Sequence, residues 1–316
     1  MIRFAVRRLL GLIGTLLVAS LLIFASLYAA PGSPLATLAG GRTLPPEAVA
    51  RLTERYHLDD PFFTRYLRWL GDAVRGDFGE SFVFKSEVSD LVSTRLATSL
   101  ILVGLASMLT LTVGVGTGVL AGVRGRLSDR LVLVGTVIAQ AVPGFVAAIF
   151  LTWIFAVELG WFPSIGAGEG EGVVGRLHHL ALPAIALSLA YGAYVARISR
   201  AATRDQMHRE HVATARARGL PSGQIVRRHV VRNALVPIST VACLSVAGLL
   251  AGTVVVERAF NLDGLGSLLV EGVVRKDFAV VQAVSLLLVT AFIVVNSAVD
   301  LFYALLDPRI DVGARR

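Results

Sequence analysis

Six long apolar stretches divide this chain, and they constrain its fold more than any other feature of the sequence. They lie at residues 9–30, 96–123, 131–157, 180–196, 236–256 and 280–306. A helix needs about 17 residues or more to cross the apolar core of a bilayer, and only the fourth stretch is near that limit. The whole chain is 55% hydrophobic and only 16% charged, which is typical of a membrane protein. We therefore expect an all-α polytopic protein with about six transmembrane helices.

The charges between these stretches alternate in sign along the chain. Arginines cluster before the first stretch and after the second, fourth and sixth, whereas acidic residues predominate after the third and fifth. Loops rich in arginine stay on the cytoplasmic side of a membrane, so we expect both termini to be cytoplasmic. The uncharged run at 9–30 exceeds the roughly 7–15 apolar residues of a signal peptide, and we interpret it as an uncleaved first span.

The segment between the first two spans is long enough to carry structure of its own. Within it, residues 45–58 and 61–75 each have the spacing of a short amphipathic helix. We expect a small external lobe here, which either caps the helix ends or docks a partner, since periodicity cannot separate the two roles. The expected divisions are 1–30 for the N-terminal tail and first span, 31–95 for the external lobe and 96–316 for a core of five spans.

A basic interval at residues 197–235 separates the fourth and fifth spans. Its nine arginines are Arg197, Arg200, Arg204, Arg209, Arg216, Arg218, Arg227, Arg228 and Arg232. The pattern predicts one helix from Arg204 to Ala217 that stops at Gly219, because glycine suits the left-handed position after a helix. Pro221 can then start a second helix. Two short helices at an angle, on the cytoplasmic side, would give another protein a surface to bind.

Polar groups inside the spans are costly unless they are satisfied, so each can mark a functional position. Gln140 lies about 14 Å into the third span by helical rise, near the middle of the bilayer. Pro143 follows within a turn and should bend this helix. The two residues fit a permeation pathway, and an ordinary interhelical hydrogen bond is the alternative. Asp300 lies near the cytoplasmic end of the last span, where a structural tie is favoured over a proton relay.

Small residues in the spans predict close packing rather than chemistry. Gly114, Gly118 and Gly122 recur every four residues in the second span, a spacing that lets helices approach closely in a membrane. After the fifth span, residues 267–274 form a short apolar helix that could re-enter the membrane, provided that protein surrounds it.

The sequence lacks the residue patterns of an enzyme. Residues Gly79 to Ser86 approach a phosphate-binding loop, but Phe84 stands where a second glycine must let backbone amides reach phosphate. His208 and His211 flank Glu210 with a spacing other than that of the H-E-x-x-H zinc motif. The single cysteine precludes an intrachain disulfide. We expect no catalytic residues, no metal site and no nucleic-acid partner, because the arginines flank spans instead of forming one basic face.

The basic interval resembles the EAA loop of ABC importer permeases. The matching residues are Glu210, Val212, Ala215, Arg216, Ala217, Gly219, Leu220, Ile225, His229, Arg232, Asn233, Ala234, Leu235 and Pro237. As in the family pattern, the glycine follows the glutamate by nine residues. An ordinary basic cytoplasmic loop would explain the arginines, but it would not explain this order of residues.

Motifs elsewhere resemble the dipeptide, oligopeptide and nickel branch of these permeases, in particular the subunit with a long first external segment. They lie at residues 31–34 (PGSP), 65–67 (RYL), 76–81 (GDFGES), 179–184 (HLALPA), 264–266 (GLG), 281–282 (VQ) and 305–309 (LLDPR). The chain departs from the branch at residues 260–263, where FNLD stands in place of an aromatic–proline pair.

The resemblance implies the ABC type I importer permease fold and a multi-pass place in a bacterial inner membrane. It implies a second homologous permease, two cytoplasmic ATPases that hold ATP and Mg, an external substrate-binding protein, and no cofactor on this chain. The pair of permeases could be a homodimer or a heterodimer, and the resemblance favours a heterodimer. The expected function is import of di- or oligopeptides. The alternatives are an ion-coupled secondary transporter, or the same architecture importing nickel or another small solute.

The resemblance and the polar positions together give three groups of candidate residues. Coupling to the ATPase is expected at Arg204, Met207, Glu210, His211, Val212, Ala213, Ala215, Arg216, Ala217 and Gly219. The pathway is expected at Gln140, Pro143, Ser239 and Cys243. An external gate is expected at Glu257, Asp263, Gly264 and Gly266. In this hypothesis, closure of the ATPase pair moves residues 203–219 as a rigid unit.

Overall fold

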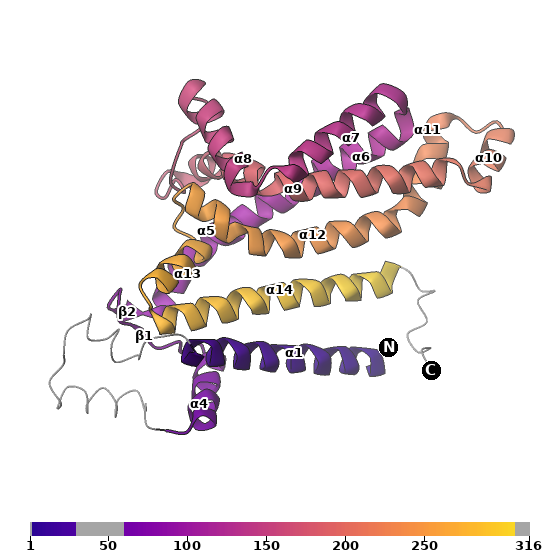
Figure 1. Cartoon of the computed structure of the whole chain (residues 1–316). Coiled ribbons are helices and arrows are strands. Elements are labelled where there is room, and N and C mark those ends of the chain that lie inside the picture. Colours follow the sequence, from indigo (N-terminus) through magenta and orange to yellow (C-terminus); the bar gives the residue numbers. More distant parts are fainter. Residues whose placement is uncertain (1, 30–59, 307–316) are drawn as a thin grey trace, which may run out of the picture. The chain divides into compact units, whose positions relative to one another are not determined.

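The computed structural model describes residues 2–29 and 60–306, and its helices match the predicted spans (Figure 1). Five helical segments are long and apolar enough to cross a membrane, at Arg8–Ser26, Val88–Arg124, Gly172–Met207, Ser222–Ala259 and Phe278–Ala298. A bent pair, Leu127–Ala141 and Gly144–Glu158, brings the number to six if the pair is one span. The all-helical fold with about six spans is therefore confirmed.

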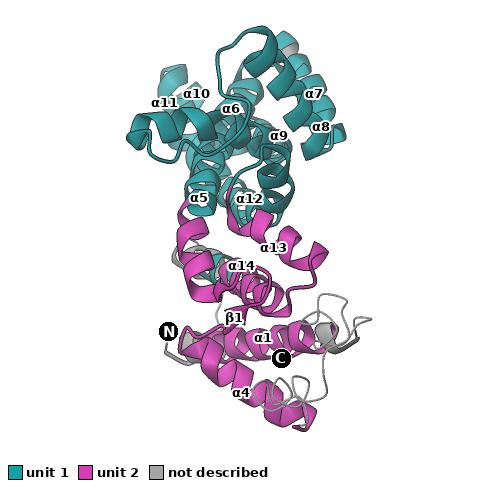
Figure 2. Cartoon of the chain, turned by 90° about the vertical axis from the view of Figure 1, so that its left-hand side faces the viewer, with its two compact units in different colours: residues 1, 98–262, 294–316 teal, residues 2–97, 263–293 magenta. Residues whose placement is uncertain are grey.

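The described chain contains helices α1 (Ile2–Ala29), α4 (Phe62–Val74), α5 (Val88–Leu109), α6 (Val115–Arg124), α7 (Arg126–Ala141), α8 (Gly144–Leu151), α9 (Gly172–Met207), α10 (Glu210–Ala217), α11 (Ser222–Ile225), α12 (Arg232–Ala259), α13 (Leu265–Val274) and α14 (Phe278–Leu306). Three π-helical segments, η1 (Thr110–Gly114), η2 (Thr152–Glu158) and η3 (Val226–Val231), interrupt or extend them. Two short strands, β1 (Glu80–Ser81) and β2 (Ser86–Glu87), form an antiparallel hairpin. Figure 2 colours the two compact units into which these elements group, residues 98–262 with 294–306, and residues 2–29 and 60–97 with 263–293.

The third span is broken between α7 and α8, as Pro143 predicts. The two helices meet at 104°. Val142 leaves the helical region at ψ 119° and Pro143 follows at ψ 144°, because proline disfavours the helical conformation in the residue before it and has no N–H to donate. The carbonyl of Pro143 then accepts the N–H of Ala147 at 3.0 Å and starts α8.

The larger unit is built around α9, which packs against α6, α7, α8 and α12. Its core includes Leu102, Leu180, Leu249 and Phe260, all almost fully buried. The glycines spaced by four on α6 lie against α9: a Cβ built on Gly118 would come within 2.7 Å of the Cβ of Ser199, and one on Gly122 within 2.7 Å of that of Thr203. The predicted packing role of these glycines is thus confirmed.

The smaller unit contains α1, α4, the hairpin, α13 and parts of α5 and α14. Its core joins Val88 of α5, Leu268 of α13 and Val280 of α14. Asp277 is fully buried, where it accepts hydrogen bonds from Ser81 Oγ at 2.5 Å and from Val83 N–H at 3.2 Å. Because it also accepts Val280 N–H at 3.3 Å, its carboxylate caps α14 and fixes the hairpin to it.

Two predicted short helices of the smaller unit are present. The helix expected at 61–75 is α4, and the one expected at 267–274 is α13, which begins two residues earlier. The amphipathic helix expected at 45–58 lies outside the described residues, as does the side chain of Asp300. The external lobe as a whole therefore remains a prediction.

Candidate coupling site and membrane pathway

The basic interval forms an elbow, residues 204–231, at the end of α9. The prediction of one continuous helix from Arg204 to Ala217 is wrong, because α9 runs to Met207 and α10 begins only at Glu210. The N–H groups of His208 and Arg209 donate hydrogen bonds to the carbonyls of Asp205 and Gln206, respectively, each three residues earlier in the chain. Arg209 then takes an extended conformation with ψ 151°. This break lets α10 leave the direction of α9, with Glu210 at the N-terminal end where a negative charge is favoured.

The second turn of the elbow follows the sequence prediction closely. Gly219 has φ +75°, its N–H bonds to the carbonyl of Arg216 at 2.9 Å, and Leu220 N–H bonds to the carbonyl of Ala215 at 3.3 Å. This double closure is the Schellman motif, which requires a left-handed residue after the helix. Pro221 is extended and directly precedes α11. Its carbonyl accepts the first hydrogen bonds of that helix.

The elbow has a small core of its own. Val212 and Ala215 of α10 are buried against Ile225 and Val230, and Met207 and Leu220 pack against the same cluster. Three of the residues predicted to couple to an ATPase, namely Met207, Val212 and Ala215, therefore point into the elbow. Their placement holds α10 on the second half of the elbow.

The other predicted coupling residues lie on the exposed side of the elbow. They are Arg204, Glu210, His211, Ala213, Arg216, Ala217 and Gly219. At 3.6 residues per turn, Glu210, Ala213 and Ala217 face away from the buried pair Val212 and Ala215. His211 is partly engaged within the elbow, since its Nε2 lies 3.2 Å from the carbonyl oxygen of His229. The outward face of α10 thus offers one carboxylate and two alanines, which let another surface approach closely.

Asp129, which the sequence reasoning missed, lies beside the elbow. It stands in the first turn of α7, with a side chain only 11% exposed, and it accepts hydrogen bonds from two arginines of α9. Arg200 binds both carboxylate oxygens through Nε and Nη2, and Arg204 Nη1 lies 2.8 Å from Oδ2. This clamp attaches the start of α7 to the last turns of α9. A single acid in a short arginine-rich cytoplasmic loop is the signal that could have indicated it.

The four predicted pathway residues do not form one site. The amide nitrogen of Gln140 is buried and has no hydrogen-bond partner among the described residues, and Pro143 lies at the break of the third span. Ser239 and Cys243 are half-buried on α12, and the Ser239 hydroxyl donates to the carbonyl of Val236 at 3.0 Å. Each residue stays a separate candidate.

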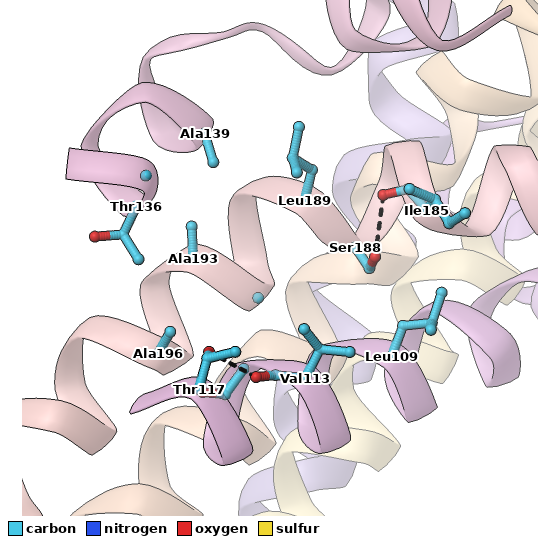
Figure 3. Close-up of a pocket in the computed structure, with 13 residues that line it drawn as sticks. Leu109, Val113, Thr117, Thr136, Ala139, Ile185, Ser188, Leu189, Ala193 and Ala196 are labelled. Carbon is cyan, nitrogen blue, oxygen red and sulfur yellow. Dashed lines mark hydrogen bonds between the residues drawn. The ribbon is translucent and has the colours of Figure 1, made fainter. Parts of the chain in front are cut away.

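A pocket of about 290 Å³ lies instead between the end of α5, η1, α6, α7 and α9 (Figure 3). Its hydroxyl groups are used inside their own helices: Ser188 donates to the carbonyl of Ile185 at 3.0 Å, and Thr117 donates to that of Val113 at 2.7 Å. Thr136 likewise donates to the carbonyl of Leu133 at 2.9 Å, and the remaining lining is alanine, glycine and aliphatic side chains. None of the residues that line the pocket is charged.

The predicted external gate residues also differ in their surroundings. Glu257 is fully buried and accepts a hydrogen bond from Ser99 of α5 at 2.6 Å. Asp263 is exposed, whereas Gly264 and Gly266 are buried at the start of α13. Glu257 therefore ties α12 to α5 within the larger unit. No cluster of three or more metal-ligating side chains occurs among the described residues.

The comparisons with known proteins agree with this architecture, which is that of the membrane subunit of an ABC importer. Residues 114–312 match the family model "Binding-protein-dependent transport system inner membrane component", and residues 1–103 match the model of the N-terminal part of such membrane components. The chain belongs to this family. It is thus a multi-pass inner-membrane permease with no catalytic role or cofactor of its own, and ATP is hydrolysed on a partner ATPase.

The similarity to individual relatives extends over almost the full length of the chain. The chain is 36% identical over 98% of its length to the "Glutathione transport system permease protein GsiC" of Shigella flexneri serotype 5b, and it covers 99% of that protein. The protein of the same name from Escherichia coli K12 matches with the same identity and coverage. This family membership excludes the ion-coupled transporter that the sequence left open.

A solved structure gives the same fold at lower sequence identity. A chain of the MetNI methionine ABC transporter, in inward-facing conformations, superposes with a TM-score of 0.55 at 20% identity. The match covers 69% of this chain and 96% of that one. The ABC importer permease fold is therefore confirmed.

Proposed function

We propose that this chain forms one half of the translocation pathway of a peptide importer and that α10 couples it to a separate ATPase. The two relatives named above support the substrate class, since their names assign them to transport of glutathione, a tripeptide, and they match the chain along its whole length. The partners are a second homologous permease, two cytoplasmic ATPases and an external substrate-binding protein. Nickel or another small solute is the alternative cargo.

The observation that carries the coupling role is the division of α10 into a buried and an exposed face. Val212 and Ala215 anchor the helix in the elbow core, so a force applied to its outward face moves the whole elbow. Glu210, Ala213 and Ala217 on that face are exposed. We assign to them the contact with the ATPase cleft, where Glu210 accepts hydrogen bonds and the alanines permit close approach.

The motion of the elbow reaches the membrane through two attachments to α9. The Asp129 clamp connects the last turns of α9 to α7, and the glycines of α6 pack directly on the same helix. To drive the motion, the ATPases must bind one conformation of the permease more tightly than the other. A reversal of an inward–outward population from 1:99 to 99:1 takes about 5.5 kcal/mol.

The substitution Ala213→Arg tests the contact. Its long charged side chain leaves the elbow core intact, because Ala213 is exposed, but it blocks close approach of another protein. We expect the ATPase to be lost when the permease complex is purified and ATP-driven uptake into vesicles to fall to background. The matched control is Ala201→Arg, an exposed position on α9 outside the outward face of α10, which should keep the ATPase bound. Equal retention of the ATPase by both variants would contradict the coupling role.

The same vesicles test the substrate class. With the external receptor added, vesicles of the unmodified complex should accumulate a labelled tripeptide when ATP is supplied. Accumulation of Ni²⁺ with no uptake of the peptide would retain the ATP-driven mechanism and overturn the peptide assignment.

A further inference from the structure

Helix α4 has three distinct faces. Four apolar side chains, Phe63, Leu67, Leu70 and Val74, lie within about 60° of one another at 3.6 residues per turn. Among the described residues, Phe63 is 69%, Leu67 65% and Val74 81% exposed. We call these four residues the apolar stripe. An exposed stripe of this size on a helix indicates a surface that something apolar covers.

The second face of α4 attaches the helix to the first span. Tyr66 is buried, and its hydroxyl oxygen lies 2.8 Å from Ser20 Oγ of α1. The ring of Phe24 packs against those of Phe62 and Trp69, each with centroids 5.4 Å away. Figure 1 shows α4 running across the axis of α1 near the C-terminal end of that helix, which is the outer end in the orientation that the arginines predict.

The third face of α4 is charged. It carries Arg65, Arg68, Asp72 and, at the end of the helix, Arg75. Arg68 pairs with Asp60 at 2.8 Å, and Arg75 lies 3.4 Å from Asp72. The basic groups lie on the opposite side of the helix from the apolar stripe, so α4 is strongly amphipathic.

We propose that α4 lies in the membrane surface, with the apolar stripe in the outer leaflet and its basic face at the lipid phosphates. A helix of 13 residues is about 20 Å long, too short to cross a bilayer. Its arrangement of apolar, aromatic and arginine side chains is that of an interfacial helix. Tyr66 and Trp69 add the aromatic groups that are enriched at this depth.

Two observations favour lipid over a protein as the occupant of the stripe. The side of α1 that carries Ser20 and Phe24 continues toward the N-terminus as exposed apolar surface, with Ile13 at 45% and Leu17 at 46%, and α1 is a candidate span. The stripe therefore continues the surface by which α1 meets acyl chains. The basic face also complements the negative charge of phosphate headgroups. The proposal does not depend on which solute the protein imports.

The test places an environment-sensitive fluorophore on each face of α4 in the full complex. Because Cys243 is the only cysteine of the chain, a Cys243→Ala background allows single labels at Phe63→Cys on the stripe and at Arg68→Cys on the charged face. The complex is reconstituted in vesicles of phosphatidylethanolamine and phosphatidylglycerol. Quenching is then measured with a spin label carried near the top of the lipid acyl chain and with aqueous iodide.

We expect the label at Phe63→Cys to be quenched several-fold more by the lipid-borne spin label than by iodide, and the label at Arg68→Cys to show the reverse. A second stripe position, Val74→Cys, should behave as Phe63→Cys does, so that a local effect of one substitution does not decide the result. Quenching of both stripe labels by iodide alone would place the stripe in water. Quenching by neither agent would mean that protein covers it. Either result overturns the proposal.

Discussion

The carboxylate of Asp129 receives two guanidinium groups from one neighbouring helix, and the three side chains form a network instead of a single ion pair. Arg200 engages both carboxylate oxygens, a geometry that fixes direction as well as distance. The ion pair of Asp205 and Arg209, at the end of α9, has no such constraint, because both side chains are more than half exposed. Surface pairs of that kind contribute little to stability.

This difference predicts unequal effects for two conservative substitutions. Asp129→Asn keeps the volume of the side chain and removes its charge, so Arg200 and Arg204 lose their shared partner. We expect ATP-driven uptake to fall several-fold while the ATPase still co-purifies, because the elbow itself stays intact. The control is Asp205→Asn, which should leave uptake near the unmodified level. The same loss of uptake in both variants would show that Asp129 has no special position.

The left-handed conformation of Gly219 gives a second prediction, which concerns the local stability of the elbow. Its φ of +75° costs an L-residue about 1–2 kcal/mol, so Gly219→Ala should open the elbow locally. Amide hydrogen exchange of residues 210–225 is then expected to accelerate by about tenfold, the factor that about 1.4 kcal/mol gives. Gly223→Ala is the matched control, since Gly223 lies in α11 with open space at its Cβ position. Equal exchange rates in the two variants would be inconsistent with the left-handed turn.

At the scale of elements, α9 is the helix on which the larger unit is assembled. It is 36 residues long and contains Pro183. Along its cytoplasmic half it packs against α6, whose glycines there leave no room for a side chain. In a membrane, where no hydrophobic effect drives helices together, such close backbone contact is a main source of association. The spacing of the glycines could be seen in the sequence, whereas the identity of the partner helix could not.

This contact predicts that Gly118→Leu separates α6 from α9. A leucine there would overlap Ser199, and overpacking of this kind costs about 1–3 kcal/mol. We expect a lower apparent Tm of the purified complex in detergent. Gly116→Leu is the control two positions earlier on the same helix, where a Cβ meets nothing within 4 Å. A drop in Tm of the same size for Gly116→Leu would argue against a specific contact at Gly118.

For the whole molecule, the features that could be predicted from the sequence are those that the length of apolar stretches and local turn residues determine. The five candidate spans and the bent pair followed from apolar length, the bend from Pro143, and the end of α10 from Gly219. The break at His208 was missed, because neither His208 nor Arg209 is a strong helix breaker and the break depends on the elbow core. The Asp129 clamp was missed because it joins residues that are 71 and 75 positions apart.

The separate core of the elbow has a consequence for how such a transporter can change over evolutionary time. Val212, Ala215, Ile225 and Val230 hold the shape of the elbow without help from the outward side chains of α10. Substitutions at Glu210, Ala213 or Ala217 can therefore accumulate with little effect on the bilayer-embedded helices. With the coupling role that we propose for α10, a permease built in this way could be matched to a new motor protein by altering a few side chains, without change to the helices through which the solute passes.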